Sequence, residues 1–228
     1  MDDPGIAPAE HVRALSGLAR LNRWSRSASH LWRCLMRVRP AGKGAPGSSD
    51  HGPWKILDIA TGSGDLPLAL WRRSRRRRLS MQIDGVDTSA LALTIAKQRA
   101  LQAGSCSQFF QLDVLRAAIP DGYDVATISL FTHHLQDEEI VDLLTRLAES
   151  CRVVIINDLR RSPVSMFWAW LGAHVLTRSR VVHVDSIRSI RAAMTPGEFL
   201  NLAVRAGMKG GQVRKAFPAR FTFTWVRR

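Results

Sequence analysis

The chain has 228 residues and a mass of 25.4 kDa, enough for one domain with a hydrophobic core. Apolar residues make up 46% and charged residues 23%, which excludes wholesale disorder. The net charge of +14 predicts an acidic partner: nucleic acid, an anionic membrane surface or an anionic substrate. Three scattered cysteines, Cys34, Cys106 and Cys151, show no metal or disulfide spacing, which favours a reducing, cytoplasmic location.

The sequence predicts neither a membrane span nor a secretory leader. The longest apolar run, Val164–Leu176, is interrupted by polar residues and is shorter than the ~18 residues that a span needs. The N-terminal stretch begins with acidic residues and lacks the apolar core of a signal peptide.

Positive charge is concentrated in two places. Residues 159–228 carry a net charge of +11, whereas residues 1–50 carry +4 and residues 51–158 carry −1. The balanced middle segment nevertheless contains the run WRRSRRRR at Trp71–Arg78. An anionic partner is therefore expected at the C-terminal third or at this arginine run.

The N-terminal region is expected to form a helical cap joined to the main domain by a linker. Apolar residues recur at helical spacing over 9–39, with a division between two helices near Ser25. Residues 39–53 are rich in glycine, proline and serine, which is typical of a flexible linker. We therefore divide the chain into a cap and linker, residues 1–50, and a main domain, residues 51–228.

From residue 54 onward, short apolar runs alternate with helical patterns. Asp65 and Ser89 are expected to cap the first two helices, and Thr195 with Glu198 a later one. Two final strands are expected to form an antiparallel pair. The predicted strands are 55–60, 81–87, 108–113, 123–130, 152–158, 212–215 and 221–226, and the predicted helices of the alternating part are 66–74, 89–103 and 137–149.

This alternation predicts an α/β fold. Continuous apolar strands indicate a parallel sheet that is covered by helices on both faces, in a Rossmann-like, doubly wound arrangement. Right-handed crossovers bring the carboxyl ends of the parallel strands to one edge, where such sheets bind ligands. The polar residues expected at that edge are Asp58 to Gly64, Asp87, Asp113, His133, His134, Asn157 and Asp158.

The loop after the first strand does not resemble a phosphate site. It reads G-x-G-x-x-P rather than G-x-G-x-x-G, and Asp65 follows Gly64 at the point where pyrophosphate would lie. A carboxylate there favours a cofactor with cationic or hydroxyl groups, such as S-adenosylmethionine. Asp87 follows the glycine loop at the sequence separation at which an acid binds ribose hydroxyls in dinucleotide folds. Asp113 is placed to meet the adenine amino group.

Four segments resemble the motifs of class I S-adenosylmethionine-dependent methyltransferases, nearest to the small-molecule branch of ubiquinone and menaquinone biosynthesis. They are ILDIATGSGDLPLAL, IDGVDTSALAL, FFQLDVL and YDVATISLFTHHLQDEEIVDLLTRLA. The resemblance covers residues 54–158. One residue departs from the pattern: Ala60 stands where the family has its first glycine.

The resemblance implies roles for the residues at the cofactor site. Asp58 would orient the methionine amino group, and Asp87 would take the ribose hydroxyls. Thr88 and Ser89 would flank the nucleoside, and Arg20, Asn22 and Arg23 of the cap would cover the cofactor. The residues implied to bind the cofactor are Asp58, Ala60, Thr61, Gly62, Gly64, Asp87, Thr88, Asp113, Val114 and Leu130, with Phe131 beneath the methionine arm.

Methyl transfer to oxygen or carbon needs alignment and often a base that removes the acceptor's proton. His133 and His134 follow strand four and are candidates, although adjacent residues point apart, so that one base is expected at most. Asp158, with Asn157, is placed to position an acceptor hydroxyl. The alternative is that these residues only hydrogen-bond or cap the loops; His183 and Asp185 form a weaker candidate pair.

Several methyltransferase classes are disfavoured. The acidic residues that a catechol-type metal site needs after strands four and five are missing, so we expect no divalent metal. The Asn/Asp-Pro-Pro-aromatic motif of amino-methylating DNA enzymes and the acidic double loop of protein-arginine enzymes are absent too.

The segment of residues 160–195 is expected to be an insert or lid. Its apolar stretch around Trp168 fits a cover over an aromatic or lipidic acceptor, peripheral membrane contact, or simply a core helix. The sequence therefore predicts methylation of a small aromatic acceptor, namely a polyketide, phenol or quinone precursor of secondary metabolism. The alternatives are an RNA methyltransferase that uses its basic C-terminal third, and a non-catalytic adenosine-binding regulator.

Overall fold

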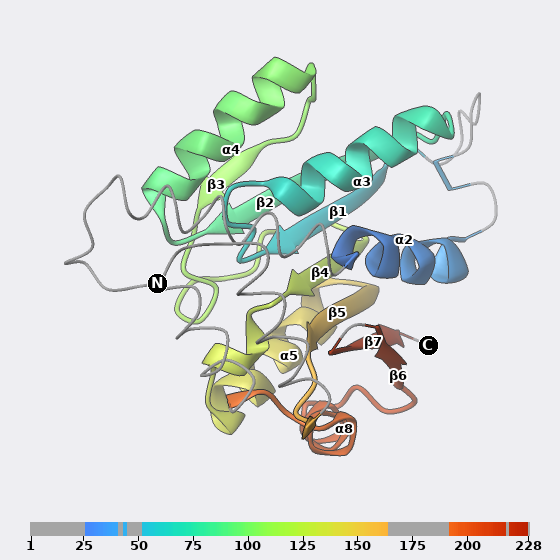
Figure 1. Ribbon diagram of the computed structural model, residues 1–228, viewed down its shortest axis with the longest axis vertical. Coiled ribbons are helices and arrows are strands. Elements are labelled where there is room, and N and C mark those ends of the chain that lie inside the picture. Colours follow the sequence, from blue (N-terminus) through green and yellow to red (C-terminus); the bar gives the residue numbers. More distant parts are fainter. Residues whose placement is uncertain (1–25, 41–42, 45–51, 164–191, 218, 228) are drawn as a thin grey trace.

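The structure, a computed structural model, describes residues 26–40, 43–44, 52–163, 192–217 and 219–227. Its centre is one seven-stranded sheet of order β3-β2-β1-β4-β5-β7-β6 (Figure 1). The strands are β1 (Trp54–Ile59), β2 (Met81–Asp87), β3 (Phe109–Gln111), β4 (Val125–Ser129), β5 (Val153–Leu159), β6 (Gln212–Ala216) and β7 (Arg220–Val226). The helices are α2 (Ser27–Val38), α3 (Asp65–Arg76), α4 (Ala90–Ala103), the 3-10 turn η1 (Thr132–His134), α5 (Asp137–Ser150) and α8 (Pro196–Arg205).

The sheet confirms the predicted mixed topology. Strands β3, β2, β1, β4 and β5 are parallel, while β7 runs antiparallel to both β5 and β6. The chain order reverses between β1 and β4, which are neighbours in the sheet. This is the switch point at which the crossovers diverge and leave a crevice at the carboxyl edge.

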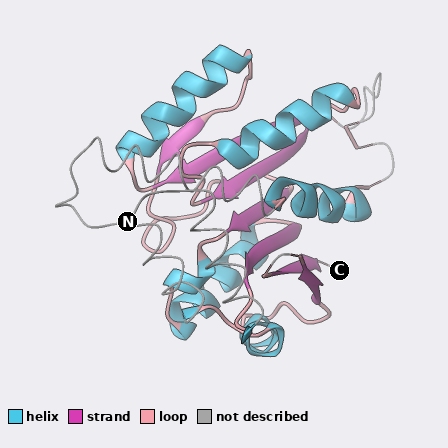
Figure 2. Cartoon of the chain, in the orientation of Figure 1, coloured by secondary structure: helices cyan, strands magenta, loops and turns pink. Residues whose placement is uncertain are grey.

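Helices cover both faces of the sheet (Figure 2). On one face, α2 and α3 bury Leu31, Leu35 and Leu70 against β1, β4 and β5. On the other face, α5 and α8 pack on the sheet. The ring centroids of Phe199 in α8 and Phe221 in β7 are 5.1 Å apart. The two-sided burial explains why the central strands read as unbroken apolar runs.

Helix ends test the capping predictions. Ser89 caps α4 by accepting a hydrogen bond from the Ala92 amide at 3.2 Å, and Thr195 with Glu198 forms a capping box at α8. The predicted cap at Asp65 is wrong: Gly64 is the N-cap of α3, at φ +72°, and Asp65 is the first helical residue. Only glycine takes this left-handed conformation without steric cost.

Two predicted regions fall largely outside the described residues. Of the helix predicted over 9–39, only α2 is described, so Arg20, Asn22 and Arg23 of the cap are not placed. Residues 164–191 of the expected lid, including His183 and Asp185, also lie outside. Among the helices that are described, none has the length and apolar character needed to cross a bilayer.

Candidate functional site

The loop between β1 and α3 winds through three residues with positive φ. Ala60 has φ +52°, Gly62 φ +56° and Gly64 φ +72°. A Cβ on Gly64 would stand 2.9 Å from the Cβ of Ala96, so this glycine also permits close packing of α3 on α4. A Cβ on Gly62 would have no described atom within 4 Å, so the loop backbone there borders open space. This backbone can approach a ligand closely.

Asp87, at the end of β2, fastens the loop. One carboxylate oxygen accepts a hydrogen bond from the Gly62 amide at 2.7 Å, and the other from the Ser89 amide at 2.9 Å. The side chain is only partly buried, and a carboxylate has lone pairs for about four hydrogen bonds. Asp87 therefore keeps acceptor capacity toward the crevice.

Asp58 lies beneath the loop and is almost fully buried, with 2% of its surface exposed. Its carboxylate accepts hydrogen bonds from the hydroxyls of Thr61 at 2.8 Å and Thr127 at 2.6 Å. Burial raises the pKa of Asp58 to about 7 against the effect of the two hydroxyls, and the nearby Asp87 adds to the rise. Near neutral pH, Asp58 is therefore divided between its neutral and its charged form.

Asp65 does not present an unpaired carboxylate to the crevice, which corrects the reasoning that it repels phosphate. Its oxygens bind Arg99 of α4 at 3.0 Å and the Ser63 hydroxyl at 2.8 Å. Arg99 also donates to the Ser63 hydroxyl at 3.0 Å. This Ser63–Asp65–Arg99 group clamps the glycine loop to α4.

The third acid of this edge, Asp113, lies two residues beyond the end of β3 and is more exposed. Asp113 accepts a hydrogen bond from the Leu115 amide at 3.0 Å and lies 3.6 Å from Arg116, with 39% of its side chain exposed. Thr88 is exposed as well, whereas Val114 is buried in the core. Asp113 therefore shapes a turn and still has an open oxygen surface beside Val114.

The end of β4 turns sharply at Leu130, which has φ +58°. Its amide donates to the Asn157 carbonyl of β5 at 3.0 Å, so the turn is tied to the neighbouring strand. Leu130 and Phe131 are both partly exposed at this point, so two apolar side chains lie at the carboxyl edge of the sheet.

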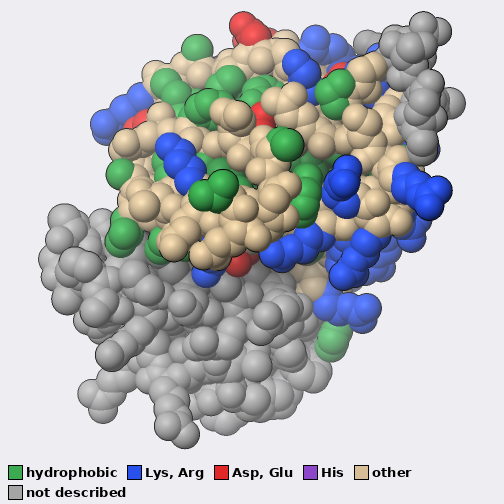
Figure 3. Space-filling view, turned by 90° about the horizontal axis from the view of Figure 1, so that it is seen from above, with side chains coloured by type: hydrophobic (Ala, Val, Ile, Leu, Met, Phe, Trp, Pro, Cys, Tyr) green, Lys and Arg blue, Asp and Glu red, His purple; other side chains and the backbone are tan. Residues whose placement is uncertain are grey.

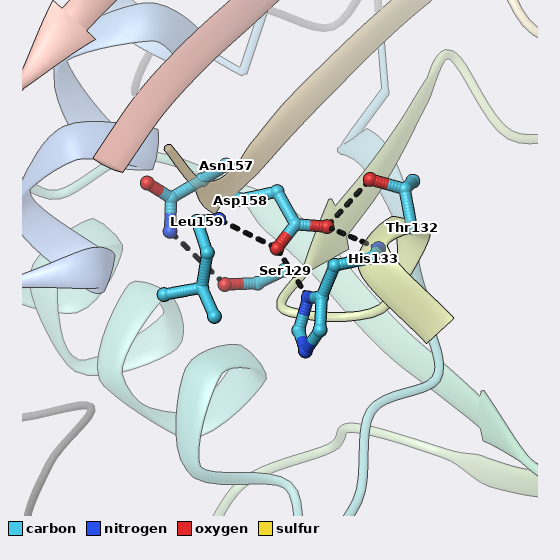
Figure 4. Close-up of polar contacts among 6 residues, drawn as sticks. All are labelled: Ser129, Thr132, His133, Asn157, Asp158 and Leu159. Atoms are coloured by element: carbon cyan, nitrogen blue, oxygen red, sulfur yellow. Dashed lines mark hydrogen bonds and ion pairs between the residues drawn. The ribbon is translucent and has the colours of Figure 1, made fainter. Parts of the chain in front are cut away.

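His133 and Asp158 form a buried pair at the ends of β4 and β5 (Figure 4). His133 Nδ1 lies 2.7 Å from Asp158 Oδ1. Asp158 also accepts hydrogen bonds from the Thr132 hydroxyl at 2.5 Å and from the amides of His133 and Leu159. Burial alone would raise the pKa of Asp158, but the His133 imidazole and these donors bring it down to about 2.

The ionised Asp158 determines the tautomer of His133. A carboxylate can only accept, so His133 donates to it from Nδ1, and in the neutral form of the ring the lone pair then lies on Nε2. Nε2 is at the end of the ring remote from Asp158 and makes no hydrogen bond to a described residue (Figure 4). His133 is thus arranged to accept a proton.

His134 differs from His133 because it is exposed. The expectation that the two rings point apart is wrong: their centroids are 4.1 Å apart, because both residues lie in the 3-10 turn rather than in a strand. The pair with Asp158 is made by the buried His133.

Three contributors to this region were missed from the sequence. Thr127, Thr132 and Arg99 each donate hydrogen bonds to an acidic residue of the edge. The polar positions within β4, which reads VATIS, were a usable signal for Thr127. The other two contacts depend on how distant elements pack.

The arginine run lies away from this edge. Helix α3 starts at the glycine loop and is about 18 Å long for its 12 residues, and Arg72, Arg73, Arg75 and Arg76 lie in the half remote from the loop. Figure 3 shows lysine and arginine side chains gathered on that side of the molecule. A nucleic acid bound to the run would therefore lie at the opposite edge of the sheet from the crevice.

A cavity of about 370 Å³ lies near the start of β2, also away from the carboxyl edge. Its buried acid, Asp84, is already bonded to the Gln82 side chain, the Gln108 amide and the Tyr123 hydroxyl. In the described part of the chain, no three His, Cys, Asp or Glu side chains gather as metal ligands would.

Residues 56–153 match the family described as a methyltransferase domain. The chain is 33% identical over 111 residues to a demethylmenaquinone methyltransferase from Thermus thermophilus, covering 47% of this chain and 49% of that one. It is 27% identical over 158 residues to a ubiquinone biosynthesis O-methyltransferase from Nitrosomonas europaea, covering 67% and 63%. The chain thus spans about half to two thirds of the length of these relatives.

Solved structures share the fold. The plantazolicin methyltransferase BpumL in complex with SAH superposes with a TM-score of 0.65 at 16% identity, covering 100% of this chain and 92% of that one. The expected resemblance to S-adenosylmethionine-dependent methyltransferases and the Rossmann-like sheet are both confirmed.

Proposed function

From the premise that residues 56–153 form a methyltransferase domain, we propose that this protein binds S-adenosylmethionine at the loop after β1 and methylates an oxygen of a small aromatic acceptor. The observation that carries the proposal is the His133–Asp158 pair, which lies at the same carboxyl edge of the sheet as the loop after β1. Transfer to carbon, which the sequence left open, also ends with the loss of a proton, and the labelled products of the acceptor screen distinguish it from transfer to oxygen.

The residues at the loop fit the cofactor. S-adenosylmethionine carries hydroxyl, ammonium and sulfonium groups and no phosphate, so it needs hydrogen-bond acceptors and negative charge. Asp87 offers acceptor capacity for the ribose hydroxyls, and Asp58 offers a carboxyl that a nearby cation would ionise. The open backbone at Gly62 leaves room for a ligand, and Asp113 with Val114 would border the adenine.

When bound, S-adenosylmethionine would supply a methyl group on a sulfonium: its carbon–sulfur bond would break as the acceptor oxygen takes the methyl group, and SAH would leave. His133 Nε2 takes the proton from the acceptor hydroxyl as the new carbon–oxygen bond forms. Asp158 holds the ring in the tautomer that has a lone pair at Nε2 and stabilises the imidazolium that results. His133 is buried, with 4% of its side chain exposed, so little water can compete with the acceptor for Nε2.

The acceptor is proposed to be a phenol or quinone precursor. Support comes from the names of the relatives, which act in menaquinone and ubiquinone biosynthesis, and from the apolar Leu130 and Phe131 at the carboxyl edge of the sheet. The proposed cofactor residues are Asp58, Ala60, Thr61, Gly62, Gly64, Asp87, Thr88, Asp113, Val114 and Leu130, and the proposed catalytic residues are His133 and Asp158, with exposed His134 at most secondary.

Calorimetry tests the cofactor site. Asp87→Ala is expected to abolish measurable S-adenosylmethionine binding, because both the ribose acceptor and the loop anchor are lost. Asp142→Ala, which removes an exposed acid on α5, should bind like the wild type. Equal binding by Asp87→Ala would remove Asp87 from the site.

A screen of phenolic and quinone-like acceptors with labelled cofactor tests the reaction. His133→Gln should lower kcat by about 100-fold or more while cofactor affinity is kept. Wild-type turnover by this variant would exclude His133 as the base. If RNA were labelled in place of the small acceptors, the RNA alternative would replace the proposal.

A further inference from the structure

The outer side of the helix pair α2 and α3 carries arginines that the proposed chemistry does not use. Both helices cover the same face of the sheet, where their apolar sides share one core. Arg73 of α3 joins them, because its guanidinium donates to the Ala28 carbonyl at 2.5 Å and to the Ser29 hydroxyl at 2.7 Å. The outer sides of the two helices therefore form one continuous surface.

Exposed arginines share one side of each helix. On α2 they lie four and seven residues apart, and on α3 three and four residues apart, which are spacings that place side chains on the same side of a helix. Figure 3 shows lysine and arginine side chains gathered on this part of the molecule. The six exposed residues, here termed the arginine face, are Arg26, Arg33, Arg37, Arg72, Arg75 and Arg76.

The positive charges of the face disfavour one another. Burial lowers the pKa of Arg73, which lies between the two helices. Three neighbouring charges lower it further, those of Arg26, Arg33 and Arg76. Helix α2 contains no acid, and α3 contains only Asp65 at its opposite end. Among the described residues, none of the six face arginines forms an ion pair.

The segments outside the described residues carry too little negative charge to neutralise the face. Residues 1–25 contain three acids and three arginines, and residues 45–51 contain one acid and no lysine or arginine. Residues 164–191 contain one acid and four arginines. The matching negative charge therefore has to come from another molecule.

Phosphate is the negative group that these side chains suit. The planar guanidinium of arginine donates two parallel hydrogen bonds to phosphate oxygens. The face extends over two helices of 12 residues, each about 18 Å long. An array of phosphates is therefore a better match than a single phosphate group.

Two features favour a lipid surface over a nucleic acid. Met36, Val38 and Leu79 are partly exposed next to exposed arginines, and the headgroup region of a bilayer accommodates apolar and basic side chains together. The tryptophans of the two helices, Trp32 and Trp71, are buried or partly buried, so neither offers an open ring for stacking on bases.

We propose that the arginine face is a docking surface for the anionic headgroups of a lipid bilayer, on which the protein lies without spanning it. The arginines of α3 are in the half of the helix remote from the glycine loop. Docking therefore leaves the crevice at the carboxyl edge open, and this inference does not depend on the proposed methyl transfer.

Sedimentation with vesicles tests the proposal on the full chain. Binding to vesicles in which about a third of the phosphatidylcholine is replaced by phosphatidylglycerol is compared with binding to phosphatidylcholine alone. The triple variant Arg33→Gln, Arg75→Gln, Arg76→Gln is expected to bind the anionic vesicles about 100-fold more weakly than the wild type, because each basic residue at such a surface contributes about fivefold. Added salt should weaken wild-type binding steeply.

A matched triple variant removes the same charge elsewhere. Lys209, Arg214 and Lys215 are exposed on and before β6, in the basic C-terminal third of the chain. Replacing all three by glutamine should weaken vesicle binding far less, because these charges lie outside the arginine face.

Thermal unfolding checks that the variants are folded. The Tm of the face variant should equal or exceed that of the wild type, because removing exposed like charges relieves the repulsion on Arg73. If this variant does not fold, the double variant Arg37→Gln, Arg72→Gln is measured in the same way.

Three results would overturn the inference: equal losses in the two triple variants, equal binding to anionic and neutral vesicles, or binding that salt does not weaken. Displacement from the vesicles by a short RNA or DNA duplex at the same phosphate concentration would assign the face to nucleic acid instead. Methyl transfer to a soluble acceptor should be unchanged in the face variant, because none of its residues belongs to the site. Loss of docking and failure of the proposed function are therefore separate results.

Discussion

Replacing Asp58 by asparagine should stabilise the protein relative to the wild type, and this gain in unfolding free energy should be larger at alkaline pH than at acidic pH. Asp58 is 2% exposed, and within the described residues its carboxylate accepts hydrogen bonds from two neutral hydroxyls, those of Thr61 and Thr127. Asparagine has the same shape, and either hydroxyl can rotate to accept its N–H. The variant thus keeps the contacts and removes the charge.

The magnitude follows from the raised pKa of Asp58, which is about 7 in the folded chain against an ordinary value of 3.8. A raised carboxyl pKa means that the folded state holds the proton more tightly than the unfolded state. Its contribution to stability is therefore complete below pH 3.8 and is lost as pH rises through 7. Each pH unit in that window costs about 1.4 kcal/mol, so the wild type loses roughly 3 kcal/mol relative to Asp58→Asn between pH 5 and pH 8.

Urea unfolding of both proteins at pH 5 and pH 8 measures this difference. The free-energy gap between variant and wild type should widen by roughly 3 kcal/mol at the higher pH. Asp142→Asn, at an exposed acid, should show no comparable widening. A gap that stays constant with pH would refute the reasoning, because it would mean that Asp58 is ionised throughout.

Three further substitutions test the geometry of the edge. Ala60→Gly should raise Tm by about 1–4 °C in thermal unfolding, because it relieves a left-handed alanine at φ +52°. Gly64→Ala should lower the free energy of unfolding by about 2 kcal/mol or more, because φ is +72° and the new Cβ would stand 2.9 Å from Ala96. Asp158→Asn should cost about 2–4 kcal/mol and depress kcat, because it leaves His133 and the Thr132 hydroxyl without their ionised acceptor; wild-type kinetics would contradict this.

Local patterns were sufficient to predict most of the fold. The apolar runs located the central strands, and the caps at Ser89 and Thr195 were found because a single side chain bonds its own helix. The failure at Asp65 has a physical cause: aspartate is a good N-cap, but the backbone at Gly64 takes a left-handed conformation that sequence preferences do not reveal.

For the candidate site, the sequence predicted which residues lie at the edge of the sheet but not which of them bind each other. Because strand ends meet at one edge, His133 and Asp158 could both be named as candidates. That they bind each other depends on the register between β4 and β5, which joins residues 25 positions apart. The Asp58–Thr127 bond spans 69 positions and was likewise inaccessible to local patterns.

Two buried carboxyls at this edge differ in ionisation, and this difference leads to a last prediction. Asp158 is held by the His133 imidazole and backbone amides, with a pKa of about 2, whereas the donors to Asp58 in the described part of the chain are two hydroxyls, and its pKa is about 7. A cationic ligand at the loop would lower the pKa of Asp58, so its proton leaves on binding. Near pH 7 we expect S-adenosylmethionine to release up to about half a proton, seen as a binding heat that varies with the ionisation enthalpy of the buffer. Asp58→Asn should abolish this release, and SAH, which lacks the sulfonium charge, should release less. A buffer-independent heat for the wild type would show that Asp58 does not respond to the ligand.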